Sequence, residues 1–254
     1  MPDILDYPLL VFVLSLAVLT PAARLGARWF GNTAPTQELR DAIGVVKAAT
    51  LTLLGLLIGF AFSMAVSRYD QRKNLEEEEA NAIGTAYVRV DLLPAAEAAR
   101  ARPLLRQYLD LRIRNYVSRE GEALRQIDVE TAKLQAELWK VIVGPANAQP
   151  NPVMALVVAS MNDVLNSQGY AQAAWWNRIP PTAWCLMALI ALIANLLMGM
   201  GSKKSKTESF LLLVSPVVVS ISFLLIADID SPRGGLIRVQ PQNLHALAES
   251  LRAP

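Results

Sequence analysis

The sequence predicts an all-α membrane protein with four transmembrane helices and a helical extramembrane unit between the second and the third. Hydrophobic residues make up 53% of the 254 residues, and charged residues only 18%. The apolar residues are gathered in blocks rather than spread along the chain, which excludes an ordinary soluble domain. A helix needs about 20 apolar residues to cross roughly 30 Å of hydrocarbon. Four windows of about that length carry no charge: 7–23, 48–67, 179–202 and 209–227.

These windows divide the chain into four parts. The first window is short, but the leading residues contain Asp3 and Asp6 and no basic residue, which favours a retained anchor over a signal peptide. The first predicted part is a transmembrane hairpin at 1–67, with spans at about 7–29 and 46–67. A helical extramembrane unit at 68–178 follows it, and then a second hairpin at 179–227, with spans at about 180–201 and 209–227. The last part is a tail at 228–254 with a short amphipathic helix.

The extramembrane unit carries 14 basic and 14 acidic residues, so it is solvated and electrically neutral. Apolar residues recur at helical spacing in three stretches, which we predict as helices: 94–120, 127–143 and 153–178. The pair Gly144-Pro145 predicts the end of the middle helix, because proline lacks the backbone N–H that a helix interior needs.

The second span joins the extramembrane unit without a helix breaker. No Pro or Gly lies between Ser63 and Gly84, so one helix is expected to cross the bilayer and continue into water. Residues four apart lie nearly in line on a helix. One such row contains only small residues, which lets another helix approach closely. This predicted packing ridge consists of Gly55, Gly59, Ser63 and Ser67.

A second row on the same helix consists of Thr52, Leu56 and Phe60. It lies about 60° around the helix from the packing ridge, at about 100° per residue. The residues alone indicate contact with lipid or with another helix, which is the usual role of apolar side chains in a membrane.

The densest charge is the run Glu76 to Glu79. Four consecutive residues surround most of a helix, so they cannot all face one partner. One interpretation is a solvated collar that Arg72 and Lys73 partly neutralise from one turn away. The other is that Glu78 or Glu79 faces an oligomer axis and forms an acidic ring, which would favour cations.

The sequence gives little support for an enzyme, a metal site, a cofactor or nucleic-acid binding. The single His245 and the single Cys185 cannot assemble a catalytic base, a nucleophile pair or a zinc cluster, so no catalytic or metal-binding residue is predicted. The net charge of +2 is too small to indicate nucleic-acid binding. After the last span, Asp228 and Asp230 are interpreted as a solvated helix end.

The run from Gly59-Phe60 to Arg68-Tyr69 resembles the second transmembrane helix of the bestrophin channels, with the same spacing from Gly-Phe to Arg. Over most of its length the chain resembles a bacterial membrane family described as bestrophin-like. That resemblance is carried by SRYDQR at 67–72, EEANAIGTAY at 78–87 and DLLP at 91–94. A shorter resemblance follows the last span, where Ser-Pro-Arg-Gly at 231–234 is similar to the Asn-Pro-Phe-Gly motif that follows the last span of the bestrophins. The stretch 236–242 contains no acid, so the calcium site of eukaryotic bestrophins is not expected.

The resemblance implies a bestrophin-like architecture in which Thr52, Leu56 and Phe60 line the neck of a pore. It implies a passive ion channel, built as a homo-oligomer such as a pentamer, in a bacterial inner membrane. A non-conducting membrane scaffold or sensor is the alternative function. Basic residues near the span ends divide seven against six between the two sides, so the positive-inside rule does not set the orientation. The resemblance places the extramembrane unit in the cytoplasm.

Overall fold

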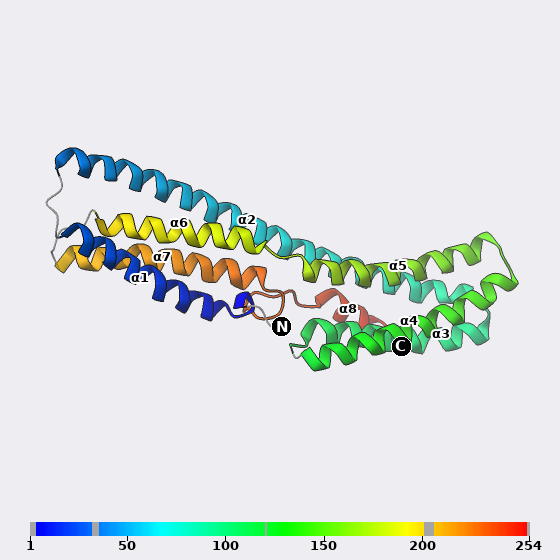
Figure 1. The fold of residues 1–254 in the computed structure, drawn as a ribbon. Helices are drawn as coiled ribbons and strands as arrows, with labels where there is room; N and C mark the ends of the chain where they lie inside the picture. The colour runs from blue at the N-terminus through cyan, green and yellow to red at the C-terminus, as the bar shows by residue number, and fades with distance from the viewer. Residues whose placement is uncertain (1–3, 32–35, 120, 201–205, 253–254) are drawn as a thin grey trace. The chain divides into compact units, whose positions relative to one another are not determined.

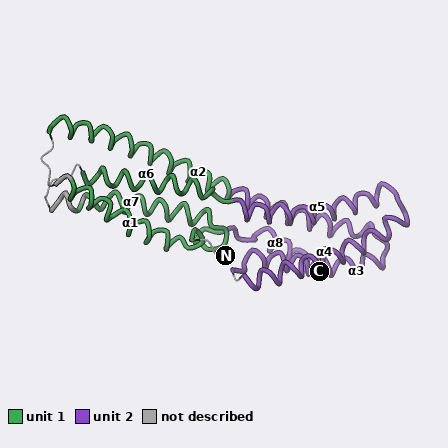
Figure 2. Tube along the Cα trace, in the orientation of Figure 1, with its two compact units in different colours: residues 1–69, 178–238 green, residues 70–177, 239–254 purple. Residues whose placement is uncertain are grey.

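The computed structural model shows an α-helical protein. Within those residues every regular element is a helix, and no strand occurs. The chain forms two compact units, which Figure 2 distinguishes by colour: residues 1–69 with 178–238, and residues 70–177 with 239–254. The described ranges are 4–31, 36–119, 121–200 and 206–252. Residues 32–35 and 201–205, which hold parts of the predicted hairpin connections and the last residue of the predicted third span, lie outside them.

The first unit contains the membrane-spanning helices, so the predicted fold class is confirmed. Four helices are long and apolar enough to cross a membrane. The helices labelled in Figure 1 divide between the units as Figure 2 shows: α1, α6 and α7 belong wholly to this unit, and α2 contributes its first part. Their bounds are α1 Pro8–Gly31, α2 Gln37–Arg89, α6 Pro181–Met200 and α7 Lys206–Asp230, with a short 3-10 helix η1 at Ile4–Asp6 before α1.

The helix α2 runs without interruption for 53 residues. The absence of Pro and Gly between Ser63 and Gly84 predicted this continuity. One row of α2 enters the core of the first unit: Leu54, Ala61 and Ala65 are buried. These positions are seven and four residues apart, which is the spacing of one helix face.

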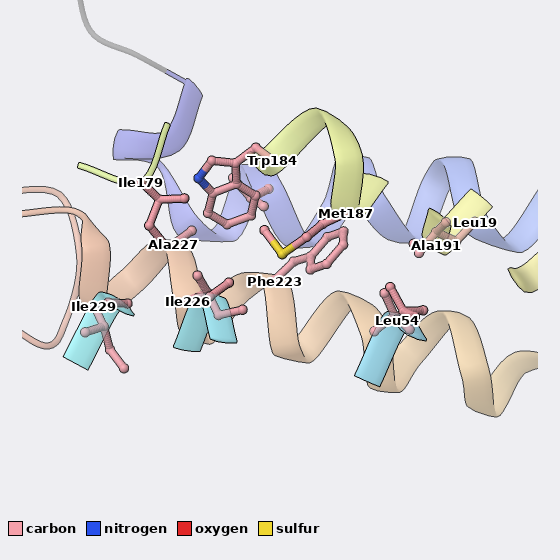
Figure 3. Packing of buried hydrophobic residues seen from close by; sticks show 14 of the residues in the cluster. Leu19, Leu54, Ile179, Trp184, Met187, Ala191, Phe223, Ile226, Ala227 and Ile229 are labelled. Atoms are coloured by element: carbon pink, nitrogen blue, oxygen red, sulfur yellow. The ribbon is translucent and has the colours of Figure 1, made fainter. Parts of the chain in front are cut away.

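The core of the first unit is a cluster of aromatic and aliphatic side chains. Figure 3 shows Trp184 and Met187 of α6 beside Phe223 of α7, and Leu54 of α2 belongs to the same cluster. The rings of Trp184 and Phe223 meet edge to face with centroids 5.9 Å apart. This geometry is favoured because the positive ring edge meets the negative ring face.

Close packing between α1 and α6 depends on two glycines. A Cβ added at Gly199 would overlap the carbonyl oxygen of Ala23, and a Cβ at Gly26 would overlap that of Leu196. Any larger residue at either site would push the helices apart. Gly26 and Gly199 therefore make a close contact between two helices of the described chain, and no pattern in the sequence predicted this pair.

The second unit is a bundle of four helices and the far part of α2. The bundle helices are α3 Ala95–Val117, α4 Gly121–Ala148, α5 Pro152–Trp176 and α8 Gln242–Ser250, and a 3-10 helix η2 at Val90–Leu92 follows α2. The predicted end of α4 at Gly144-Pro145 is wrong, because α4 continues to Ala148 and Gln149 donates to the Pro145 carbonyl. Pro145 lacks the N–H of a helix interior wherever it lies, and here only three further residues of α4 follow it, so little of the helix lies beyond the lost hydrogen bond.

Candidate functional site

The three candidate neck residues lie on the surface of α2. Leu56 is 52% exposed and Phe60 59% exposed, and Thr52 is exposed as well. The Thr52 hydroxyl donates to the carbonyl of Ala48 at 2.9 Å. Because its polar hydrogen is already used within the helix, Thr52 can present its methyl group to its surroundings. The row is therefore less polar than its sequence suggests.

The packing ridge lies on the surface of α2 as well. Gly55, Gly59, Ser63 and Ser67 are all exposed. No described atom outside the local helix lies within 4 Å of a Cβ built at Gly55 or at Gly59. Within the described chain the ridge has no partner helix, so a neighbouring chain or lipid must cover it in a membrane. Leu54 faces the opposite way, into the core.

The acid run divides between surface and interior. Glu77 and Glu78 are exposed, whereas Glu76 is 1% and Glu79 0% exposed. The fully solvated collar is therefore wrong for Glu76 and Glu79. Burial of a carboxylate is costly unless it is paired, so both should have partners.

Glu79 finds its partners on α3. Its carboxylate forms an ion pair with Arg112 and accepts a hydrogen bond from the Tyr116 hydroxyl at 3.2 Å. Burial raises the pKa of the Tyr116 phenol, and the negative charge of Glu79 raises it further. Tyr116 therefore stays protonated and remains a donor. In this arrangement Glu79 is not available to an exposed acidic ring, which leaves Glu78 for that role.

Glu76 holds the start of α8. Its carboxylate accepts from the backbone N–H of Leu244 at 3.0 Å and from the side-chain amide of Asn243 at 2.7 Å. Pro241, at the N-cap position of α8, supplies no side-chain hydrogen bond. Glu76 thus satisfies a backbone donor that a capping side chain usually satisfies, and its charge suits the positive end of the helix dipole.

The interpretation of Asp228 and Asp230 as a solvated helix end is also wrong. Both are buried. The Asp230 carboxylate accepts from the backbone N–H of Ile179 at 3.1 Å. Its Oδ1 atom lies 3.6 Å from Arg68 Nη1, and its Oδ2 atom lies 3.9 Å from Arg178 Nε. Its neighbour Asp228 accepts from two backbone N–H groups of the following loop, each at 2.8 Å.

These carboxylates therefore fix the end of α7 and the loop after it. Their oxygens are used by backbone N–H groups and guanidinium groups, which compete with any cation. Among the described residues there is no group of three or more His, Cys, Asp or Glu side chains that could hold a metal ion.

Comparison with known proteins identifies a family and a fold. A family model described as the Bestrophin-like domain matches residues 12–244. A crystal structure of a bacterial bestrophin homolog from Klebsiella pneumoniae, solved by Zn-SAD phasing, is 14% identical, with a TM-score of 0.64 over 96% of this chain and 95% of that chain. A point variant of that homolog is 14% identical, with a TM-score of 0.65 over 99% and 96%. No match was found among curated proteins.

Proposed function

Because the chain belongs to the bestrophin-like family, we propose that it assembles as a homo-oligomeric, passive ion channel. The resemblance to the bestrophin channels favours a channel over an enzyme, and the four apolar helices agree with a membrane location. The observation that carries the proposal is the exposed face of α2. Two rows of residues share that face, one of them apolar and one of them small, and neither is covered by the described chain.

In the proposed channel, copies of α2 surround a central axis. Thr52, Leu56 and Phe60 form three stacked rings that make the neck. A hydrophobic constriction gates ion flow by dewetting, since an ion must leave its hydration shell to pass. The internal hydrogen bond of Thr52 supports this role, because it leaves the methyl group to face the axis. A pentamer suits this arrangement, whereas a dimer leaves no room for an axial pore.

The packing ridge supplies the contact between neighbouring copies of α2. We expect Gly59→Leu to shift the detergent-solubilised protein to smaller assemblies, because a leucine side chain prevents close approach of the backbones. Light scattering after size-exclusion chromatography measures the change. Gly44→Leu is the matched control, since Gly44 is also on α2 with no neighbour within 4 Å. An unchanged assembly in Gly59→Leu would show that the ridge is not the interface.

Glu78 is the candidate for an acidic ring on the same helix. Neutralisation by Glu78→Gln is expected to lower the preference for cations over anions, because a ring of carboxylates attracts cations. Reversal potentials in a salt gradient measure that preference. Glu97→Gln, on α3, removes the same charge elsewhere and should leave the reversal potential unchanged. Equal reversal potentials in all three proteins would remove Glu78 from the ion path.

The proposed location is the bacterial inner membrane, with the second unit in the cytoplasm. Single cysteines replacing Gln37 and Glu137, in a Cys185→Ala background, test the orientation. An impermeant thiol reagent applied to intact cells is expected to label the cysteine at position 37 and to spare the one at position 137. The opposite labelling would place the second unit outside the cytoplasm.

Conduction itself is tested with purified protein in a planar bilayer. We expect currents above protein-free controls in symmetric salt, carried by a passive pathway that needs no energy source. Absence of current across voltage, pH and calcium concentration would contradict the channel and favour the non-conducting scaffold or sensor. In that case the exposed face of α2 would serve assembly alone.

A further inference from the structure

The second unit contains a small polar pocket that the channel proposal does not use. It lies between α4 and α5, has a volume of about 230 Å³, and is lined by two facing rows of side chains. One row comes from α4 and the other from α5, each with members three or four residues apart. The rows are Asp128, Thr131 and Gln135, opposite Gln168, Gln172 and Trp176.

The hydrogen bonds within the pocket leave both acceptors and donors unused, the amide N–H groups of Gln168 and Gln172 among the donors. The amide nitrogen of Gln135 donates to the Tyr108 hydroxyl at 3.4 Å and to the Gln168 carbonyl oxygen at 3.5 Å. The Gln135 carbonyl oxygen is then left to accept. Thr131 is only 3% exposed, and its hydroxyl oxygen has no hydrogen-bond partner among the described residues. A buried hydroxyl is normally hydrogen-bonded, so Thr131 leaves a polar group unsatisfied in the wall of the pocket.

The charged groups that line the pocket determine whether it favours a cation or an anion. Asp128 is exposed and supplies a carboxylate, and no lysine or arginine lines the pocket. An anion would therefore be repelled. Trp176 is 73% exposed at the same pocket, and an indole face attracts cations. A divalent metal ion fits poorly, because Ca²⁺ takes six to eight oxygen ligands and Mg²⁺ keeps an octahedral shell.

From this geometry we infer that the pocket between α4 and α5 binds a small primary ammonium compound that also carries a hydroxyl or ether oxygen. The ammonium group donates to Asp128 and lies against the Trp176 indole. The oxygen is held by the amides of Gln168 and Gln172. The volume corresponds to about seven or eight water molecules at roughly 30 Å³ each, which limits the ligand to about that many non-hydrogen atoms.

Two sources supply such a group. A free amino alcohol is one, and the ethanolamine headgroup of a membrane lipid is the other. The lipid headgroup is a candidate because the pocket lies close in sequence to an apolar helix. Trp176 precedes Pro181, the first residue of α6, by only five residues. The primary ammonium group is the same in both, whereas the oxygen is a hydroxyl in the free compound and a phosphate ester oxygen in the lipid.

Isothermal titration calorimetry of the full chain in detergent tests the inference with ethanolamine as the probe. We expect saturable binding of ethanolamine, binding at least tenfold weaker for choline, which has no N–H donor, and none for glycerol, which has no charge. Glycerol that binds as well as ethanolamine, or ethanolamine that does not bind, would overturn the inference.

Substitutions in the pocket test whether ethanolamine binds there. Asp128→Asn and Gln172→Leu are expected to weaken ethanolamine binding at least tenfold. Asp163→Asn makes the same change at an exposed site on α5 outside the pocket and should leave binding unchanged. Circular dichroism and size-exclusion profiles check that each variant is folded. Equal affinity in all four proteins would assign the binding to another site and overturn the inference.

Measurements in lipid nanodiscs distinguish a free amino alcohol from a lipid headgroup as the natural ligand. If the lipid headgroup fills the pocket, phosphatidylethanolamine in the nanodisc will lower the apparent affinity for free ethanolamine relative to nanodiscs of phosphatidylglycerol alone. Equal affinity in the two lipids assigns the pocket to the free compound. Both results retain an ammonium site and distinguish its two sources, and neither depends on whether the protein conducts ions.

Discussion

Leu56→Ala and Phe60→Ala are each expected to increase ion flux through the reconstituted protein several-fold. Both side chains are large, apolar and exposed on α2, at 52% and 59%. If they form rings around an axis, truncation to alanine widens the constriction and lets water enter it. A wetted constriction lowers the barrier for a hydrated ion. Flux assays in liposomes, with a fluorescent reporter of ion concentration, measure the change.

The control must be a leucine that faces lipid. Leu54 is unsuitable although it lies close by, because it is buried in the core of the first unit and its truncation would lower stability. Leu189 on α6 is 54% exposed, which matches Leu56. Leu189→Ala should conduct like the parent protein. Equal flux in the parent, both α2 variants and this control would remove the pore assignment from α2.

The sequence predicted the helices of this protein better than their contacts. Span lengths and the absence of breakers depend on neighbouring residues, so hydropathy and spacing were sufficient for the continuity of α2 beyond Ser63 and for four candidate spans among the described residues. The partners of the buried carboxylates could not be predicted in this way. Asp230 bonds the backbone of Ile179, which is 51 positions away, and Glu79 pairs with Arg112, which is 33 positions away. No local pattern marks such pairs.

The glycines show the same limit. Gly55 and Gly59 form the regular row that a sequence pattern detects, yet within the described chain nothing packs against them. Gly26 and Gly199 lie on different helices, and the backbone of a neighbouring helix packs against each of them. A row of small residues is visible in one helix, whereas a pair across two helices requires knowledge of which helices meet.

The buried ion pair of the second unit is expected to matter more for stability than any surface pair. Arg112 and Glu79 are 0% exposed. Among the described residues, the Nη1 and Nη2 atoms of Arg112 have no hydrogen-bond partner, so Glu79 is the group that compensates its charge. Removing one member leaves the other as an unpaired buried charge, at a cost of about 3–5 kcal/mol.

Arg112→Met is therefore expected to destabilise the second unit by about that amount, since it leaves the Glu79 carboxylate without its cation. Arg125→Met is the control, because Arg125 pairs with Glu122 on the surface, and exposed pairs contribute about 0–1 kcal/mol. Denaturant unfolding in detergent, followed by tryptophan fluorescence, measures both. Trp175 reports on this region directly, because its ring packs edge to face on Tyr116 at 5.4 Å.

A second change separates the charge from the packing. Adding Glu79→Gln to Arg112→Met removes the unpaired charge and keeps an acceptor for the Tyr116 hydroxyl. The double variant should therefore be more stable than Arg112→Met alone, because a neutral amide costs less to bury than a carboxylate. If the double variant is instead less stable than Arg112→Met, the loss comes from the shape of the arginine side chain, and the ion pair is not what holds α2 to α3.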